Sequence, residues 1–131
     1  MIEIKQISER EIWVGECKVY LGDDGIIYNI AEGNRNDKEL ALGIKEAVLK
    51  LSNLYEKKMN LFVDLNNAPQ PSSEARKAYQ SIAEHDKIGK IAMFGLHPVA
   101  RVLAAFIMGF SKKKDTRFFK TKEEALAWLK E

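Results

Sequence analysis

A polar segment directly after the apolar run 61–65 carries the first side chains that could do chemistry. Asp64 is the last residue but one of this run, Asn66 follows the run, and Ser72 and Ser73 stand at the start of a predicted helix. A carboxylate at the end of a strand can bind a cation, act as a base, or hold the following loop by accepting backbone N–H bonds. The last role suits a lone carboxylate best, and Ser72 is expected to cap the helix.

A second polar group follows the apolar run 90–95. Gly95 allows close approach, and His97 precedes Pro98, which suits the first turn of a helix. The start of a helix attracts anions, and Arg101 lies one turn further on. Gly95, His97 and Arg101 are therefore candidate anion- or ligand-binding residues, with a surface position in a turn as the alternative for His97. Neither polar group pairs a nucleophile with a base, so no enzyme activity is expected.

The elements that must position these side chains follow from the spacing of apolar residues. Three strands are expected within residues 2–7, 12–21 and 26–30, and their connections are too short for crossovers, so they are antiparallel. Helical and extended patterns then alternate, which predicts parallel strands because a strand–helix–strand crossover returns the chain to the same sheet. The predicted fold class is α/β, a mixed sheet with an antiparallel N-terminal meander followed by parallel β-α units. Functional groups gather where loops leave the carboxyl ends of such strands.

Two capping boxes mark helix starts. Asn36 and Glu39 predict the first, before a helix whose apolar stripe runs through 40–55. Gly43 weakens this helix by about 1 kcal/mol unless close packing against another backbone requires it. Residues 121–124 predict the second box, before the last helix.

Length and composition indicate a single domain, residues 1–131, of ordinary globular type, with 46% hydrophobic and 31% charged residues. Cys17 is the only cysteine, which excludes an internal disulfide and a cysteine-based zinc site and fits a cytoplasmic protein. We expect no metal and no cofactor. The N-terminus lacks the pattern of a signal peptide, and the apolar run 102–110 is about half the length that spans a bilayer.

The predicted helix 99–110 is apolar on nearly every side. Val102 belongs to its core stripe, while Ala105 and Met108 continue the apolar surface around the cylinder. Such a helix is either buried on all sides or meets a second surface. Since a chain of this size normally leaves a helix face in water, Ala105 and Met108 are candidate interface residues of a homodimer.

The segment from Lys87 to Lys122 is strongly basic, with Asp115 as its only acid. Such a segment is either a solvated surface or a surface for an anionic partner. It lacks interleaved exposed aromatic residues, so nucleic-acid binding is not expected.

The element order, the run 61–65 and the ending 117–129 together resemble the STAS-like proteins of bacteria and archaea, which include the anti-sigma-factor antagonists. The sub-branch that looks most similar contains small, mostly uncharacterised proteins that are also compared with CRAL-TRIO-type lipid-transfer domains. The resemblance covers nearly the whole chain and implies a STAS-like fold.

In the antagonists, a phosphorylatable serine stands at the N-terminus of the helix after the central strand. Ser72 or Ser73 matches this position and is the candidate phosphorylation site that the resemblance implies. The chain departs from the antagonist pattern, because Pro71 and Glu74 are its neighbours instead of a preceding Asp and a following Gly. Capping alone is the alternative role.

The expected function is a non-enzymatic regulatory or interaction domain that acts through protein–protein contacts, with the serine at the helix N-terminus as its switch. The alternative is a carrier or sensor of a small anionic or lipid-like ligand held between the helices and the sheet. A protein partner and a second copy of the chain are the expected partners.

Overall fold

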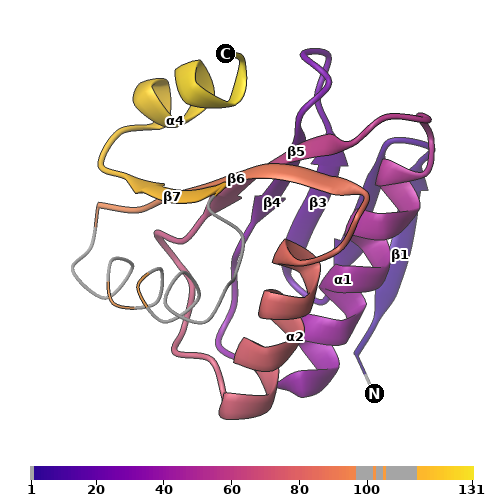
Figure 1. Cartoon of the computed structure of the whole chain (residues 1–131). Coiled ribbons are helices and arrows are strands. Elements are labelled where there is room, and N and C mark those ends of the chain that lie inside the picture. Colours follow the sequence, from indigo (N-terminus) through magenta and orange to yellow (C-terminus); the bar gives the residue numbers. More distant parts are fainter. Residues whose placement is uncertain (1, 97–101, 103–104, 106–114) are drawn as a thin grey trace.

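One seven-stranded sheet organises the molecule, and its strands lie side by side in the order in which they occur along the chain (Figure 1). The computed structural model describes residues 2–96, 102, 105 and 115–131. The strands are β1 (Ile4–Ser8), β2 (Glu11–Val14), β3 (Cys17–Leu21), β4 (Ile27–Ile30), β5 (Met59–Asp64), β6 (Ile88–Phe94) and β7 (Thr116–Phe119). Strands β1 to β4 pair antiparallel and β4 to β7 pair parallel, which confirms the predicted fold class.

The helices cover the two faces of this sheet unequally. Those that lie wholly in the described part of the chain are α1 (Lys38–Ser52), α2 (Ser73–Ala83) and α4 (Lys122–Leu129). Consecutive parallel strands joined by right-handed crossovers place α1 and α2 on the same face, whereas α4 follows the last strand and packs on the other (Figure 1). Within the described ranges, no helix is long and apolar enough to cross a membrane.

The N-terminal meander contains one strand more than the sequence predicts. A tight turn at Gly15 and Glu16 divides the stretch 12–21 into β2 and β3, so that Val14 and Cys17 are partners in register. Gly15 has a φ of +59°, and every positive φ among the described residues belongs to a glycine. A two-residue turn with positive φ only at its first position is type II′, whose twist suits a hairpin. Glycine at the first position of such a turn was the sequence signal for it.

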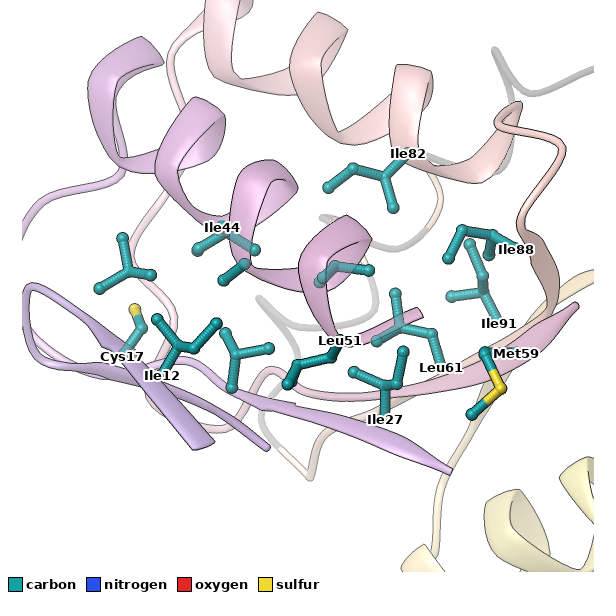
Figure 2. Packing of buried hydrophobic residues seen from close by; sticks show 14 of the residues in the cluster. Ile12, Cys17, Ile27, Ile44, Leu51, Met59, Leu61, Ile82, Ile88 and Ile91 are labelled. Carbon is teal, nitrogen blue, oxygen red and sulfur yellow. The ribbon is translucent and has the colours of Figure 1, made fainter. Parts of the chain in front are cut away.

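The larger core lies between the sheet and the pair α1 and α2. Figure 2 shows Ile44 and Ile82 of these helices over Ile27, Leu61 and Ile91 of the sheet. Each of these side chains is at most 5% exposed. Burial of apolar area contributes roughly 25 cal/mol per Å², so this aliphatic layer holds α1 and α2 on the sheet.

Helix α1 approaches the sheet closely at Gly43. A Cβ atom added there would lie 2.7 Å from Cγ1 of Val14, so close packing does require this glycine, but against a side chain and not against another backbone as expected. The predicted stripe does not extend to Leu54 and Tyr55, which are 49% and 46% exposed. The reason is that α1 ends at Ser52, so these two residues lie beyond the helix.

The predicted capping box at the start of α4 is confirmed. Thr121 Oγ1 accepts the backbone N–H of Glu124 at 3.2 Å. The Glu124 side chain reaches back as well, but it accepts the Thr121 hydroxyl at 3.1 Å.

The face of the sheet opposite α1 and α2 is aromatic. Tyr20 of β3 stacks on Tyr28 of β4, with ring centroids 4.9 Å apart and planes 3° apart. Tyr28 contacts Phe62 of β5 at 5.4 Å, and Phe62 contacts Phe94 of β6 at 6.2 Å. These four rings, called the aromatic row below, cross the sheet, and α4 packs over the end that β5 and β6 provide.

Candidate functional site

The carboxyl ends of the parallel strands meet at one edge of the sheet. Ile30, Asp64 and Phe94 end β4, β5 and β6, and Asp64 is the register partner of both other residues. The loops that follow these strands therefore begin side by side. This arrangement brings the segment of Ser72 and the start of the segment of Gly95 to the same edge, as expected.

Asp64 and Asn66 hold these loops in place. Asp64 Oδ1 accepts both the backbone N–H and the side-chain Nδ2 of Asn66, each at 2.9 Å. Asn66 Oδ1 accepts the backbone N–H of Leu96 at 2.7 Å. The loop-holding role expected of Asp64 is thus confirmed, and Asn66 links the two polar groups that the sequence singled out.

The candidate anion site is described only at its beginning. Gly95 is buried directly after β6. His97 and Arg101 lie outside the described residues, so anion binding by these three residues stays a prediction.

The candidate interface is described at two positions of its helix. Val102 is 55% exposed, so its predicted place in the core stripe is wrong. Ala105 is also exposed. Residues three apart on a helix share a face, so this face points to solvent. Met108 lies outside the described residues.

Ser72 caps α2, as predicted. Its backbone is extended, and its Oγ accepts the backbone N–H of Ala75 at 3.1 Å. Ser72 and Ser73 are both exposed. The capping hydroxyl therefore lies at the protein surface, at the positive end of the helix dipole.

Asp37, and not the predicted Asn36, caps α1. Asp37 Oδ1 accepts the backbone N–H of Leu40 at 3.0 Å, and Oδ2 accepts Nη2 of Arg35 at 2.7 Å. The Leu40 N–H and then the Arg35 guanidinium hold the pKa of Asp37 below its usual value. Asn36 and Asp37 are equally good caps by residue type. The choice falls on Asp37 because the side chain of Asn36 is engaged elsewhere.

Asn36 joins the β4–α1 loop to α2 and to the loop before it. Its Nδ2 donates to the backbone oxygen of Pro69 at 2.8 Å, and its Oδ1 accepts the Tyr79 hydroxyl. Its own backbone oxygen accepts the N–H of Ser72 at 3.0 Å. The sequence analysis missed this role, because Pro69 and Tyr79 are 33 and 43 positions away and no local pattern connects them.

A cavity of about 60 Å³ lies just inside these loops, between the sheet and the two helices. Its walls are mostly aliphatic, and its polar lining includes Cys17, Asn29, Asn36 and Tyr79. A single water needs about 10–15 Å³, whereas pockets for drug-sized ligands measure roughly 300 Å³ or more. The cavity therefore has room for several waters or for one small chemical group.

Asn29 is an unexpected polar residue among these walls. It is 6% exposed, and its Oδ1 is buried without a hydrogen-bond partner among the described residues. An unpaired buried polar group costs about 1–3 kcal/mol. The sequence analysis overlooked Asn29, although alternation along the strand places it on the same face as the core residue Ile27.

Two ionisable side chains of the cavity, Cys17 and Tyr79, are neutral at physiological pH, and Glu32 and Arg35 also belong to its lining. Burial raises the pKa of the Cys17 thiol, which donates a hydrogen bond from Sγ to the backbone oxygen of Glu32 at 3.5 Å. Burial also raises the pKa of the Tyr79 phenol. A neutral buried thiol is a poor nucleophile, so the cavity is suited to binding uncharged groups. In the described part of the chain, no three His, Cys, Asp or Glu residues gather to hold a metal ion.

Comparisons with known proteins agree with the STAS-like fold. One solved structure is an uncharacterised protein of the DUF3478 family from Shewanella loihica PV-4, described as having a SpoIIAA-like fold. It matches with a TM-score of 0.58 and 15% identity, over 98% of this chain and 92% of that chain, a likeness that shows the fold alone. No curated protein matches. A family model described as "Domain of unknown function (DUF7793)" matches residues 20–131, and the chain therefore belongs to the DUF7793 family.

Proposed function

We propose that the chain is a non-enzymatic regulatory domain that acts through contact with a protein partner, with Ser72 as its switch. The observation that carries this proposal is the position of Ser72. It is exposed, it caps α2, and its N–H bonds to Asn36 at the edge where the loops meet. The matching serine of the antagonists that the sequence resembles is a phosphorylation site, which supports the same role here.

A phosphate on Ser72 would change the charge of this surface without opposing the fold. It would add about −1.5 to −2 charges at the N-terminus of α2, where the helix dipole favours an anion. The surface nearby already carries an exposed ion pair, Lys38 with Glu74, at 3.8 Å. We therefore expect the switch to act on docking of the partner, since unfolding is not favoured by this change.

Stability measurements separate capping from switching. Ser72→Ala should lower the free energy of unfolding by about 1 kcal/mol, because the Ala75 N–H loses its acceptor. Ser72→Asp should be nearly neutral, because a carboxylate can accept the same N–H and interacts favourably with the dipole. Urea denaturation of both variants measures this difference, and equal losses would show that the hydroxyl does not cap α2 in solution.

The functional test is cross-linking in the source cells. Tagged wild type and Ser72→Asp are cross-linked and purified, and the captured proteins are quantified by mass spectrometry. Ser8→Asp is the matched control, because Ser8 is an exposed serine on the edge strand β1. We expect about a tenfold or larger change in one captured protein for Ser72→Asp alone, since a mismatched charge at an interface costs several kcal/mol. Identical partner profiles for all three proteins would refute the switch.

We also propose that the chain self-associates through the helix of the predicted interface residues Ala105 and Met108, at the face that carries Val102 and Ala105. Support comes from the exposure of both residues on a helix that the sequence predicts to be apolar nearly all round. Light scattering should find dimers of the wild type and monomers of Ala105→Glu. Leu42→Glu is the control, because Leu42 is a similarly exposed apolar residue on α1, and it should stay dimeric. A monomeric wild type would exclude this interface.

The alternative function, a carrier of a lipid-like ligand, has less support. The cavity of about 60 Å³ is small beside the several hundred Å³ that enclose a drug-sized ligand, and a lipid chain is larger still. An anionic ligand would depend on His97 and Arg101, for which the prediction stands untested.

A further inference from the structure

The cavity lined by Asn29 plays no part in the proposed switch at Ser72, and its chemistry points to a separate binding site. We infer that it takes the uncharged end of a small hydroxyl-bearing molecule, with the hydroxyl donating a hydrogen bond to Oδ1 of Asn29. This inference stands independently of the proposed function, because binding in the cavity is measured without any protein partner.

The protein supplies no partner for Asn29 from the neighbouring strands. Val19 of β3 and Val63 of β5 are its register partners, and both have apolar side chains. Oδ1 of Asn29 is buried and has no hydrogen-bond partner in the part of the chain that the structure describes, and the residue lines the cavity. Native proteins pair nearly all buried polar atoms with protein, water or ligand. We therefore assign the donor to a molecule in the cavity.

The lining selects an uncharged molecule. Cys17 and Tyr79 are neutral because burial raises the pKa of each. Arg35 lies among the lining residues, but its guanidinium is held by Asp37 at 2.7 Å. The carboxyl group of Glu32 belongs to the lining as well, but it lies in the loop after β4, at the edge of the sheet. A charged group that entered fully among Cys17, Asn29 and Tyr79 would lose its hydration without a counter-charge beside it, which is strongly unfavourable.

The walls also favour a molecule with an apolar stem over a cluster of waters. A buried water needs about two to four polar partners, whereas most of the lining is aliphatic, from residues such as Leu40, Ile44, Leu61 and Met93. A hydroxyl on a short hydrocarbon stem satisfies both the unpaired acceptor and the apolar walls. A longer molecule would extend past Glu32 and Pro69, which lie in the loops at the edge of the sheet.

The volume of the cavity limits the size of a ligand that can enter it completely, and it limits the affinity of that ligand as well. About 60 Å³ holds a group of roughly four non-hydrogen atoms. The best small ligands gain a limited free energy per atom, so a molecule of about four atoms binds with a Kd on the order of tens of micromolar at best. The test therefore needs a method that detects weak binding.

Isopropanol and acetone are a matched pair of probes for this site. They have the same number of non-hydrogen atoms, but only isopropanol donates a hydrogen bond. Each is titrated into the full chain with methyl groups labelled for NMR, and the signals of Ile44, Leu61 and Ile82 report on the cavity. We expect saturable shifts with isopropanol and about fivefold weaker binding of acetone, as the net contribution of one hydrogen bond implies.

Asn29→Leu should abolish the preference for isopropanol, because it removes the acceptor and keeps the side-chain volume. Asn53→Leu, at the exposed end of α1, is the matched control and should keep the preference. Equal binding of both probes by the wild type, shifts that do not saturate, or a preference that persists in Asn29→Leu would each overturn the inference. If Asn29→Leu does not fold, the comparison of isopropanol with acetone on the wild type is sufficient to test the inference.

Discussion

The face of the sheet beneath α1 and α2 is filled by aliphatic side chains, whereas the aromatic row crosses the opposite face. The aliphatic face contains the cavity and the unpaired amide of Asn29, close to the loops that hold Ser72. The aromatic face has rings in contact from β3 to β6 and the single helix α4 over one end. The cavity and the unpaired amide thus lie on the face where the candidate sites are, while none of the described residues on the aromatic face has a buried side-chain polar atom without a hydrogen-bond partner.

The aromatic face also accounts for part of the basic segment. The ammonium group of Lys90 lies 5.2 Å from the ring centroid of Trp128, and the guanidinium of Arg117 lies 5.0 Å from the same ring. Lys122 lies 6.0 Å from the ring of Phe62. Cations over aromatic faces are stabilised by the ring quadrupole. These three basic residues therefore pack on the protein itself, a use that the sequence analysis did not consider.

The largest expected effect is on the aromatic row. Phe62 is 0% exposed and contacts both Tyr28 and Phe94. Phe62→Ala should lower the free energy of unfolding by about 3–5 kcal/mol, because it loses buried area and leaves a cavity. Phe62→Leu, which keeps most of the volume, should cost clearly less in the same urea denaturation. A loss below about 1 kcal/mol for Phe62→Ala would mean that the row does not stabilise the sheet.

On the aliphatic face we expect a substitution that stabilises the protein. Asn29→Leu should raise the free energy of unfolding by about 1–3 kcal/mol, because it removes an unpaired buried amide. Asn60→Leu is the matched control and should be destabilising. The reason is that Asn60 is paired at both ends, through Nδ2 to the Leu129 oxygen at 2.8 Å and through Oδ1 to the Lys90 N–H at 2.9 Å. If both variants lose stability equally, the inference that the Asn29 amide is unpaired while the Asn60 amide is paired is wrong.

A smaller loss of stability is expected when the charge of Lys90, which lies over the Trp128 ring, is removed. Lys90→Met keeps most of the apolar stem and removes the charge, together with the bond from Nζ to the Trp128 oxygen at 3.1 Å. The expected loss is about 1 kcal/mol. Lys120→Met serves as the control at an exposed lysine and should change little. Thermal unfolding of both variants tests this, and equal melting temperatures would exclude a stabilising role of the Lys90 charge.

The smallest effect at neutral pH concerns the Tyr28 phenol. Burial, followed by its hydrogen bond to Asp24 at 2.5 Å, raises the pKa of Tyr28 well above the ordinary value of 10.0. The folded state then keeps a proton that the unfolded state releases, so this contribution is complete below pH 10 and is lost as the pH rises above it. Urea denaturation between about pH 9 and about pH 11 should show a weaker pH dependence for Tyr28→Phe than for the wild type. An unchanged slope would show that Tyr28 ionises equally in both states.

Much of the architecture follows from short stretches of sequence, because it depends on neighbours along the chain. Alternating helical and extended patterns predicted the parallel half of the sheet, and Ser72 and Thr121 were found as caps because a cap bonds a residue three positions later. Asp64 was likewise found as the residue that holds its own loop. The count of N-terminal strands was wrong at Gly15, although that turn is also local.

Tertiary structure decided how these pieces are used. Asn36 and Asp37 are both suitable caps, and the choice between them depends on Pro69 and Tyr79, which only the fold brings to Asn36. The unpaired state of Asn29 depends equally on which strands flank β4 and on how closely two helices pack above it. The sequence alone thus determined the kinds of elements and their order, because these are set by local hydrogen bonds and apolar spacing. The cavity and its mostly aliphatic lining were decided only by packing, because they arise from contacts among residues far apart in the chain.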